Sequence, residues 1–128
     1  MGTLYIDAMN VIGSRPDGWW HDRDAAVRRF VDDLQAYAEV AVTEVVVVVD
    51  GRPSPGLPEG RHGAVEVRYA IGGGPGAADD RIVELVAAGG TATEVVTADR
   101  ELRDRVQTLG ARVLGPRALL DRLARGDT

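Results

Sequence analysis

The sequence predicts an α/β protein in which a parallel sheet is covered by helices on both faces. Short apolar segments rich in valine alternate along the chain with segments whose apolar residues recur every three or four positions. The first kind has the length and composition of strands, and the second has one buried helical face. Strands that alternate with helices build parallel sheets through right-handed crossovers. We therefore expect a three-layer, Rossmann-like sandwich that binds its ligands beyond the carboxyl ends of the strands.

The strongest strand signal is Glu44 to Val49, which contains five consecutive valines. An unbroken β-branched run is typical of a central parallel strand that is buried on both faces. Thr3 to Ile6 is a shorter apolar run that stops at Asp7, and it is expected to form the first strand. Three further strands are expected at Ala64 to Ala70, Glu94 to Thr97 and Arg112 to Leu114.

Four helices are expected to cover this sheet. The first is capped by Asp22 or Asp24 and runs to about Ala38, with its apolar residues on one face. The other three cover about Ala77 to Ala88, Arg100 to Leu109 and Pro116 to Arg125. The segment Gly51 to Gly63 contains three prolines and four glycines, so it is expected to be a loop.

Length and composition indicate a single domain over residues 1–128. Hydrophobic residues make up 45% of the chain and charged residues 27%, which is ordinary for a globular protein. The N-terminus lacks the basic start and long apolar core of a signal peptide, and no apolar run is long enough to span a bilayer. We therefore expect a cytoplasmic protein with no membrane partner.

Two missing residue types exclude several kinds of chemistry. The chain has no cysteine, so it can form no disulfide, thiolate zinc site or cysteine nucleophile. All 15 basic residues are arginine, which excludes mechanisms that need a lysine, including that of receiver domains. The formal net charge of −5 argues against a nucleic-acid partner, unless the acidic residues are concentrated around a bound cation.

Aspartates stand at the expected carboxyl edge of the sheet. Asp7 follows the first strand, Asp50 the second and Asp99 the fourth, while Asp79 and Asp80 open a helix. Carboxylates gathered at one edge repel each other unless a cation lies among them, and they select oxygen-binding ions such as Mg²⁺ or Mn²⁺. A metal held there can make a hydroxide nucleophile and stabilise charge on a phosphoryl oxygen. The pattern therefore predicts a metal site for phosphoryl chemistry.

Each of these aspartates also has a purely structural interpretation. Asp50 and Gly51 form a common turn pair. Asp79 and Asp99 each lie near the start of an expected helix, which they can cap. The metal site is favoured by their joint placement, since capping alone does not explain why several like charges share one edge.

Three motifs resemble those of NYN domains, which are relatives of the PIN nucleases. Tyr5 to Ile12 resembles the D-x-x-N opening of that family, while Ala78 to Val83 and Val95 to Arg100 resemble its second and third acidic motifs. Their order and spacing are closest to the YacP-like branch of bacterial ribonucleases. The resemblance implies a PIN-like sandwich whose five mostly parallel strands follow the order 3-2-1-4-5. It also implies a metal-dependent endoribonuclease that cuts single-stranded RNA, and in this branch messenger RNA at the ribosome.

Carried over residue by residue, the resemblance implies a site that binds Mg²⁺ or Mn²⁺ through three aspartates. These metal ligands are Asp7, Asp80 and Asp99, and Asn10 and Asp79 are expected as catalytic partners beside them. The alternative class of function is a catalytically silent NYN-type module that binds RNA or the ribosome. The presence of all three metal-binding acids favours the enzyme.

One position departs from the family pattern. Some NYN nucleases have a further aspartate four residues after the one that matches Asp99, but Arg103 occupies that place here. Asp104 stands next to it. The choice between one metal ion and two is therefore open.

Aromatic and basic residues near the acidic edge are candidates for RNA contacts. Trp19 and Trp20 could stack on unpaired bases, or they could pack over the edge of the sheet. The arginines that could position phosphates are Arg15, Arg52, Arg61, Arg81 and Arg100.

Two other readings of the sequence compete with the metal site. His21 and His62 could act as a paired acid and base in a metal-free ribonuclease, although both fall in expected loops. Gly72 to Ala77 loosely fits a dinucleotide-binding turn. The two aspartates that open the next helix place negative charge where a pyrophosphate would lie, which disfavours that ligand.

Overall fold

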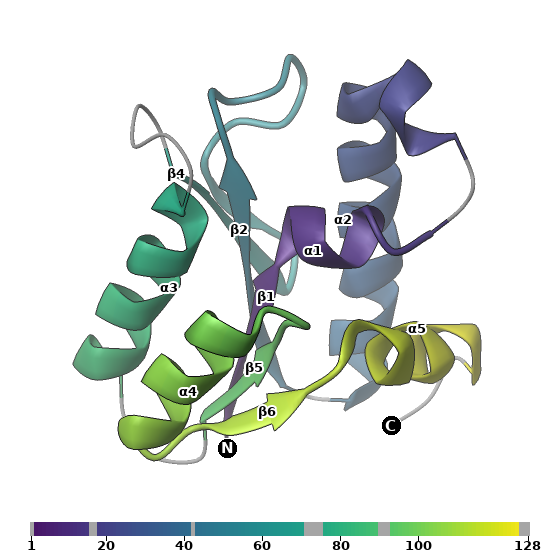
Figure 1. The fold of residues 1–128 in the computed structure, drawn as a ribbon. Coiled ribbons are helices and arrows are strands. Elements are labelled where there is room, and N and C mark those ends of the chain that lie inside the picture. Colours follow the sequence, from purple (N-terminus) through teal and green to yellow (C-terminus); the bar gives the residue numbers. More distant parts are fainter. Residues whose placement is uncertain (1, 16–17, 42, 71–75, 90–92, 126–128) are drawn as a thin grey trace.

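The computed structural model describes residues 2–15, 18–41, 43–70, 76–89 and 93–125, and shows one sheet flanked by helices (Figure 1). The strands are β1 (Thr3–Asp7), β2 (Glu44–Asp50), β3 (Gly60–His62), β4 (Val65–Ala70), β5 (Thr93–Val96) and β6 (Arg112–Leu114). The helices are α1 (Ala8–Ile12), the 3-10 turn η1 (Trp19–His21), α2 (Arg23–Ala41), α3 (Ala77–Ala88), α4 (Arg100–Thr108) and α5 (Pro116–Arg125).

The six strands lie in the order β3-β4-β2-β1-β5-β6. All neighbouring pairs are parallel except β3 and β4, which are antiparallel. The five expected strands therefore follow the expected order 3-2-1-4-5, and the α/β class is confirmed. The expected number of strands was too small by one, because Gly60–His62 pairs with Val65–Val67 at the edge of the sheet. This three-residue strand begins after the last proline of the segment that was expected to be a loop.

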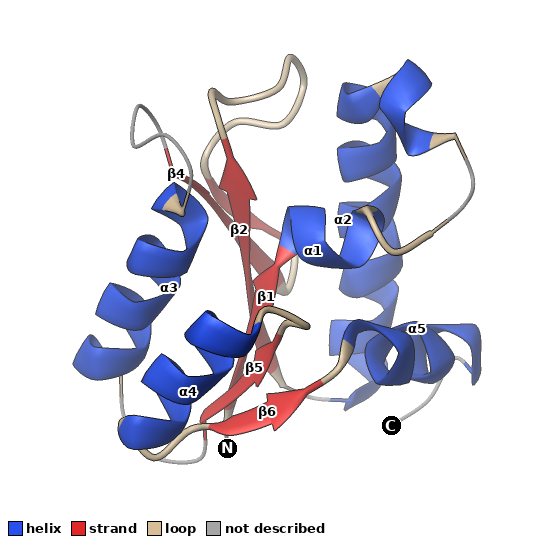
Figure 2. Cartoon of the chain, in the orientation of Figure 1, coloured by secondary structure: helices blue, strands red, loops and turns tan. Residues whose placement is uncertain are grey.

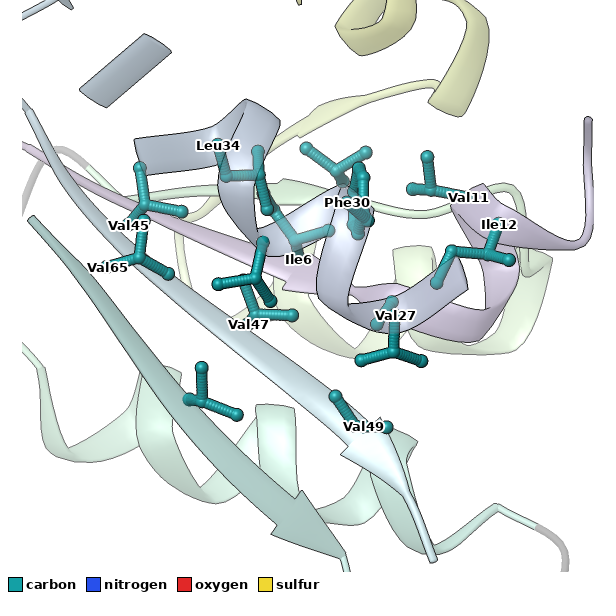
Figure 3. Close-up of a cluster of buried hydrophobic side chains, with 14 of the residues drawn as sticks. Ile6, Val11, Ile12, Val27, Phe30, Leu34, Val45, Val47, Val49 and Val65 are labelled. Carbon is teal, nitrogen blue, oxygen red and sulfur yellow. The ribbon is translucent and has the colours of Figure 1, made fainter. Parts of the chain in front are cut away.

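The helices form two layers, one on each face of the sheet (Figure 2). Helices α1, α2 and α5 cover one face, and α3 and α4 cover the other. The valine run of β2 serves both layers. Val45, Val47 and Val49 pack in the core beneath α2, as Figure 3 shows, while Val48 packs in the core beneath α3 and α4. This two-sided burial is why the strand has no polar alternation.

The helix predictions are confirmed in position. Helices α3 and α5 have the expected bounds, α2 continues to Ala41 and α4 ends at Thr108. The sequence pattern did not predict α1 or η1, because five and three residues are too few to show a helical period. No helix in the described part of the chain is both long and apolar enough to cross a membrane.

Candidate active site at the carboxyl edge of the sheet

Asp7 is the central acidic residue of the carboxyl edge. It is the last residue of β1, which lies between β2 and β5, and its exposed fraction is only 5%. Burial raises the pKa of its carboxyl group from 3.8 to about 7. The charges of Asp79, Asp50 and, more weakly, Asp99 add to this shift, while the backbone N–H of Asn10 acts against it. Four aspartates from β1, β2, α3 and the start of α4 thus share one electrostatic environment.

Asp50 at the end of β2 is bonded to the start of α3. Its Oδ1 accepts a hydrogen bond from the backbone N–H of Ala78 at 3.1 Å. The residue before this helix is Gly76, which has no side chain to cap the exposed N–H groups. The carboxylate of a neighbouring strand therefore supplies the cap and brings the first turn of α3 to the carboxyl edge.

Asp79 in that first turn is half-buried and interacts electrostatically with the other aspartates. Burial raises its pKa, and the charges of Asp99, Asp50 and Asp80 raise it further. Arg105 of α4 acts in the opposite direction. Asp79 does not cap α3, so the capping interpretation does not explain this residue.

Asp99 is held by one hydrogen bond of its side chain and one of its backbone N–H. Its Oδ1 accepts from the N–H of Leu102 at 3.0 Å, so it does cap α4, and its own N–H donates to Thr97 Oγ1 at 3.0 Å. Asn10 of α1 holds the preceding residue, because its Oδ1 accepts from the N–H of Ala98 at 2.7 Å. Asn10 therefore ties the segment after Asp7 to the segment that carries Asp99.

Asp80 lies apart from this group, contrary to the expectation that it would be one of three converging acids. Its side chain is 69% exposed and pairs with Arg105 at 2.9 Å between Oδ1 and Nη1. Adjacent helical residues point about 100° apart, so the side chains of Asp79 and Asp80 leave α3 in different directions. The charges of Asp79, Asp50 and Asp99 act on the carboxyl group of Asp7, whereas Asp80 is not among the groups that shift its pKa.

Residues 4–127 match the family described as the YacP-like NYN domain. The chain belongs to this family. UPF0178 proteins from three strains of Xanthomonas oryzae pv. oryzae are 39% identical to it over 104 residues, which cover 80% of this chain. The match covers 59% of those relatives, so the chain spans less than two thirds of their length.

Two crystal structures of Rae1 (YacP) from Bacillus subtilis show the same fold. The first, of a mutant, has a TM-score of 0.81 and 23% sequence identity, covering 98% of this chain and 77% of that one. The second has a TM-score of 0.77 and 24% identity, covering 98% of this chain and 75% of that one.

The two tryptophans of the YacP-like NYN domain have different environments. Trp19 is half-buried and packs against the core beneath α2, whereas Trp20 is 59% exposed. The rings meet edge to face, with 6.0 Å between their centroids. Trp19 thus follows the packing interpretation, and Trp20 offers an open aromatic face.

The candidate arginines differ in their exposure and in their partners. Arg52, Arg61 and Arg100 are exposed, with Arg52 two residues after Asp50 and Arg100 next to Asp99. Arg61 pairs with Glu66 at 3.7 Å, and Arg81 pairs with Glu84 at 3.5 Å. Arg15 lines a cavity of about 310 Å³ between α2 and α5, whose lining includes none of the four acids.

The remaining sequence candidates lie outside the acidic group. His21 is exposed, and the Nε2 of His62 lies 2.6 Å from the carbonyl oxygen of Pro58 in the adjoining loop. Asp104 is exposed on α4. Of the glycine-rich turn, residues 72–75 lie outside the described residues.

Two residues of the site were given no role from the sequence. Asp50 was placed at the carboxyl edge because it follows a strand, but its role there was left open. Arg105 gave no signal, because it reaches Asp80 only once α3 and α4 are packed side by side.

Proposed function

We propose that this YacP-like NYN domain is a divalent-metal-dependent endoribonuclease that hydrolyses phosphodiester bonds of single-stranded RNA. The observation that carries this proposal is that the charges of Asp50, Asp79 and Asp99 all act on the buried carboxyl group of Asp7 at the carboxyl edge of the sheet. Among the described residues, no arginine or histidine is paired with Asp7. Burial is the main cause of its raised pKa, and a cation would relieve the repulsion that adds to this shift.

The donor types fit Mg²⁺ or Mn²⁺, since both ions prefer carboxylate and amide oxygens. Over the described ranges, however, no three acidic or histidine side chains are already close enough to hold an ion. Binding therefore requires the carboxylates to rotate toward one another. We assign the ligands to Asp7, Asp79 and Asp99, with Asp79 in the place first expected for Asp80. When bound, the ion would activate water and stabilise charge that develops on the phosphoryl oxygens.

The other residues of the edge hold and orient. Asn10 fixes Ala98 and so keeps Asp99 at the site, while Asp50 fixes the first turn of α3 and so keeps Asp79 there. Arg52 and Arg100 are exposed next to the acids and are assigned to phosphate contacts. The exposed ring of Trp20 is assigned to base stacking.

Family membership extends the proposal to messenger RNA at the ribosome. This substrate is what the resemblance to the YacP-like NYN family implies, and because the chain spans less than two thirds of the length of its curated relatives, the substrate of the whole protein is itself a proposal. Comparing the cleavage of one transcript free and during translation tests it. Equal rates in the two states would remove the ribosome from the proposed function.

One observation favours a different function, a catalytically silent module that binds RNA or the ribosome. The described acids are not yet arranged around a metal position, and Asp80 is held by Arg105. Such a module would bind single-stranded RNA but leave it intact with either metal.

Cleavage of an end-labelled single-stranded RNA separates these functions. The purified protein should cut it with Mn²⁺ or Mg²⁺ and lose this activity in EDTA. The variant with His21→Ala and His62→Ala should retain most of the activity. EDTA-resistant cleavage that disappears with the histidines would replace the metal mechanism by a paired-histidine one. RNA binding without cleavage would support the silent module.

A further inference from the structure

Helix α2 holds the segment that follows β2 at two separate places. At the carboxyl edge, Ser54 Oγ donates to Asp24 Oδ1 at 2.8 Å, and Arg28 Nη1 donates to the carbonyl oxygen of Pro55 at 3.3 Å. At the far end, Gln35 Nε2 donates to the carbonyl oxygen of His62 at 2.8 Å. Residues 51–59, called the rim loop here, rise from the end of β2 beside the start of α2 (Figure 1).

Strand β4 also holds the rim loop, through the side chain of Tyr69. The hydroxyl of Tyr69 accepts from the backbone N–H of Ser54 at 3.3 Å and donates to the carbonyl oxygen of Leu57 at 2.7 Å. Ser54 and Leu57 are both only 5% exposed. Ser54 is bonded through both its side chain and its backbone, so the rim loop is fixed in place even though its proline and glycine content is typical of a flexible segment.

The rim loop presents a cation at the edge of the acidic group. Arg52 is exposed. In the sequence it lies two residues after Asp50, which belongs to that group, and two residues before Ser54, which is bonded to α2. The backbone on the other side of Arg52 is also held, because Arg23 of α2 donates a hydrogen bond to the carbonyl oxygen of Asp50. Both ends of the short stretch that carries Arg52 are thus attached to the first turn of α2.

Resting on the proposed nuclease function, we infer that Asp24 and Ser54 are positioning residues that hold Arg52 against the RNA strand entering the acidic group. When RNA binds to an arginine on a mobile loop, the loop must become ordered, and this entropic cost lowers the affinity for RNA. A loop that is already fixed avoids that cost. The Asp24–Ser54 hydrogen bond involves a carboxylate and an O–H donor, which makes it one of the stronger bonds available to the loop.

Ser54→Ala tests the inference, and Gln35→Ala is its matched control. Each variant removes one side-chain hydrogen bond of 2.8 Å between α2 and the segment after β2, but only Ser54 lies at the site end. We expect Ser54→Ala to raise KM and the Kd for a labelled single-stranded oligonucleotide about 3- to 10-fold, with kcat within about twofold of wild type. Gln35→Ala should leave KM and Kd unchanged, although both variants lower the melting temperature. Equal changes in the two variants would overturn the inference.

Asp24 gives a second, independent test. Asp24→Asn keeps an oxygen acceptor for Ser54 and should retain most of the affinity, whereas Asp24→Ala should match Ser54→Ala. If Asp24→Asn were as weak as Asp24→Ala, the hydrogen bond would not be the positioning element and the inference would fail.

Arg52→Gln connects the loop to the phosphate. It should raise Kd and reduce the slope of log K against log salt by about 1, as expected for one lost phosphate contact. Combined with Ser54→Ala it should add little, because both changes act through one contact. Independent, multiplicative effects would overturn the inference. Kd is measured without divalent metal, so a protein that binds RNA in this pattern yet cuts none contradicts the nuclease function and leaves the positioning role intact.

Discussion

The side chain of Asn10 accepts a hydrogen bond from the backbone N–H of Ala98 at 2.7 Å, across 88 positions of the sequence. The bond joins α1, which follows directly after Asp7, to the segment just before Asp99. One amide therefore ties the end of β1, which carries Asp7, to the segment that carries Asp99 at the start of α4. This explains why an asparagine three residues after Asp7 belongs to the site even though its oxygen is already in use.

Asn10→Ala should reduce cleavage about 10- to 100-fold, because Asp99 loses its fixed position relative to Asp7. The free energy of unfolding should fall by only about 1 kcal/mol, the usual effect of one hydrogen bond. Ser14→Ala is the control, since it removes a different side-chain bond near the end of α1, from Ser14 Oγ to the carbonyl oxygen of Val11. A similar loss of cleavage in both variants would show that α1 matters only for stability.

Asp79 and Asp80 should differ sharply when each is replaced by asparagine. Asp79→Asn removes a carboxylate from the group around Asp7 and should lower the cleavage rate at least about 100-fold. Asp80→Asn breaks an exposed ion pair with Arg105 and should leave the rate within about threefold of wild type. Rates measured at saturating Mn²⁺ check the difference. The reverse ranking would return Asp80 to the metal and contradict the assignment made here.

These neighbours mark the limit of what could be predicted from the sequence. Strand order and helix positions were predictable because the valine run of β2 and the period of α2 are long and regular. The aspartates could be placed at the carboxyl edge for the same reason. Which member of the Asp79–Asp80 pair faces inward depends on the rotation of α3, and Asp50 sets that rotation through its bond to Ala78. No local pattern encodes that long-range contact.

The same limit explains the elements that were missed. β3 forms from Gly60–His62 because β4 offers a free edge, and Gln35 of α2 then binds the carbonyl oxygen of His62. A glycine-containing triplet has no strand signal of its own. The rim loop likewise looks flexible in sequence, yet Ser54 and Leu57 are buried against α2 and β4.

The stability of the metal-free protein should fall as the pH rises from about 4 to about 7. The pKa of Asp7 is 3.8 in an ordinary environment and about 7 in the folded protein. Between these values the folded state holds a proton that the unfolded state has released, so each unit of pH costs up to about 1.4 kcal/mol. The raised pKa of Asp79 acts in the same direction.

Urea unfolding in EDTA at several pH values measures this effect. Wild type should be less stable at pH 8 than at pH 5, and Asp7→Asn should show a flatter profile and be the more stable protein at pH 8. Added Mn²⁺ should stabilise wild type at pH 8 much more than the variant, since a ligand that binds only the folded state raises its stability. Parallel profiles for the two proteins would show that Asp7 is not the titrating group.

Trp20 and Trp19 should separate RNA binding from folding. Trp20 is 59% exposed, so Trp20→Ala should leave the melting temperature nearly unchanged while raising KM about 5- to 150-fold, which corresponds to about 1–3 kcal/mol for one stacked base. Trp20→Phe keeps an aromatic face and should recover most of the affinity. Trp19 packs against the core, so Trp19→Ala should lower the free energy of unfolding by about 1–3 kcal/mol.

The substrate can be varied to confirm that a base is the partner of Trp20. An oligonucleotide with an abasic site at the stacking position should bind wild type as weakly as the intact oligonucleotide binds Trp20→Ala. The abasic change should then have no further effect on the variant, because stacking is lost only once. If the abasic site weakened both proteins equally, Trp20 would not contact that base. If Trp20→Ala lowered the melting temperature as much as Trp19→Ala, the edge-to-face contact between the rings would be its main role, and the RNA would have to be held by the arginines of the carboxyl edge alone.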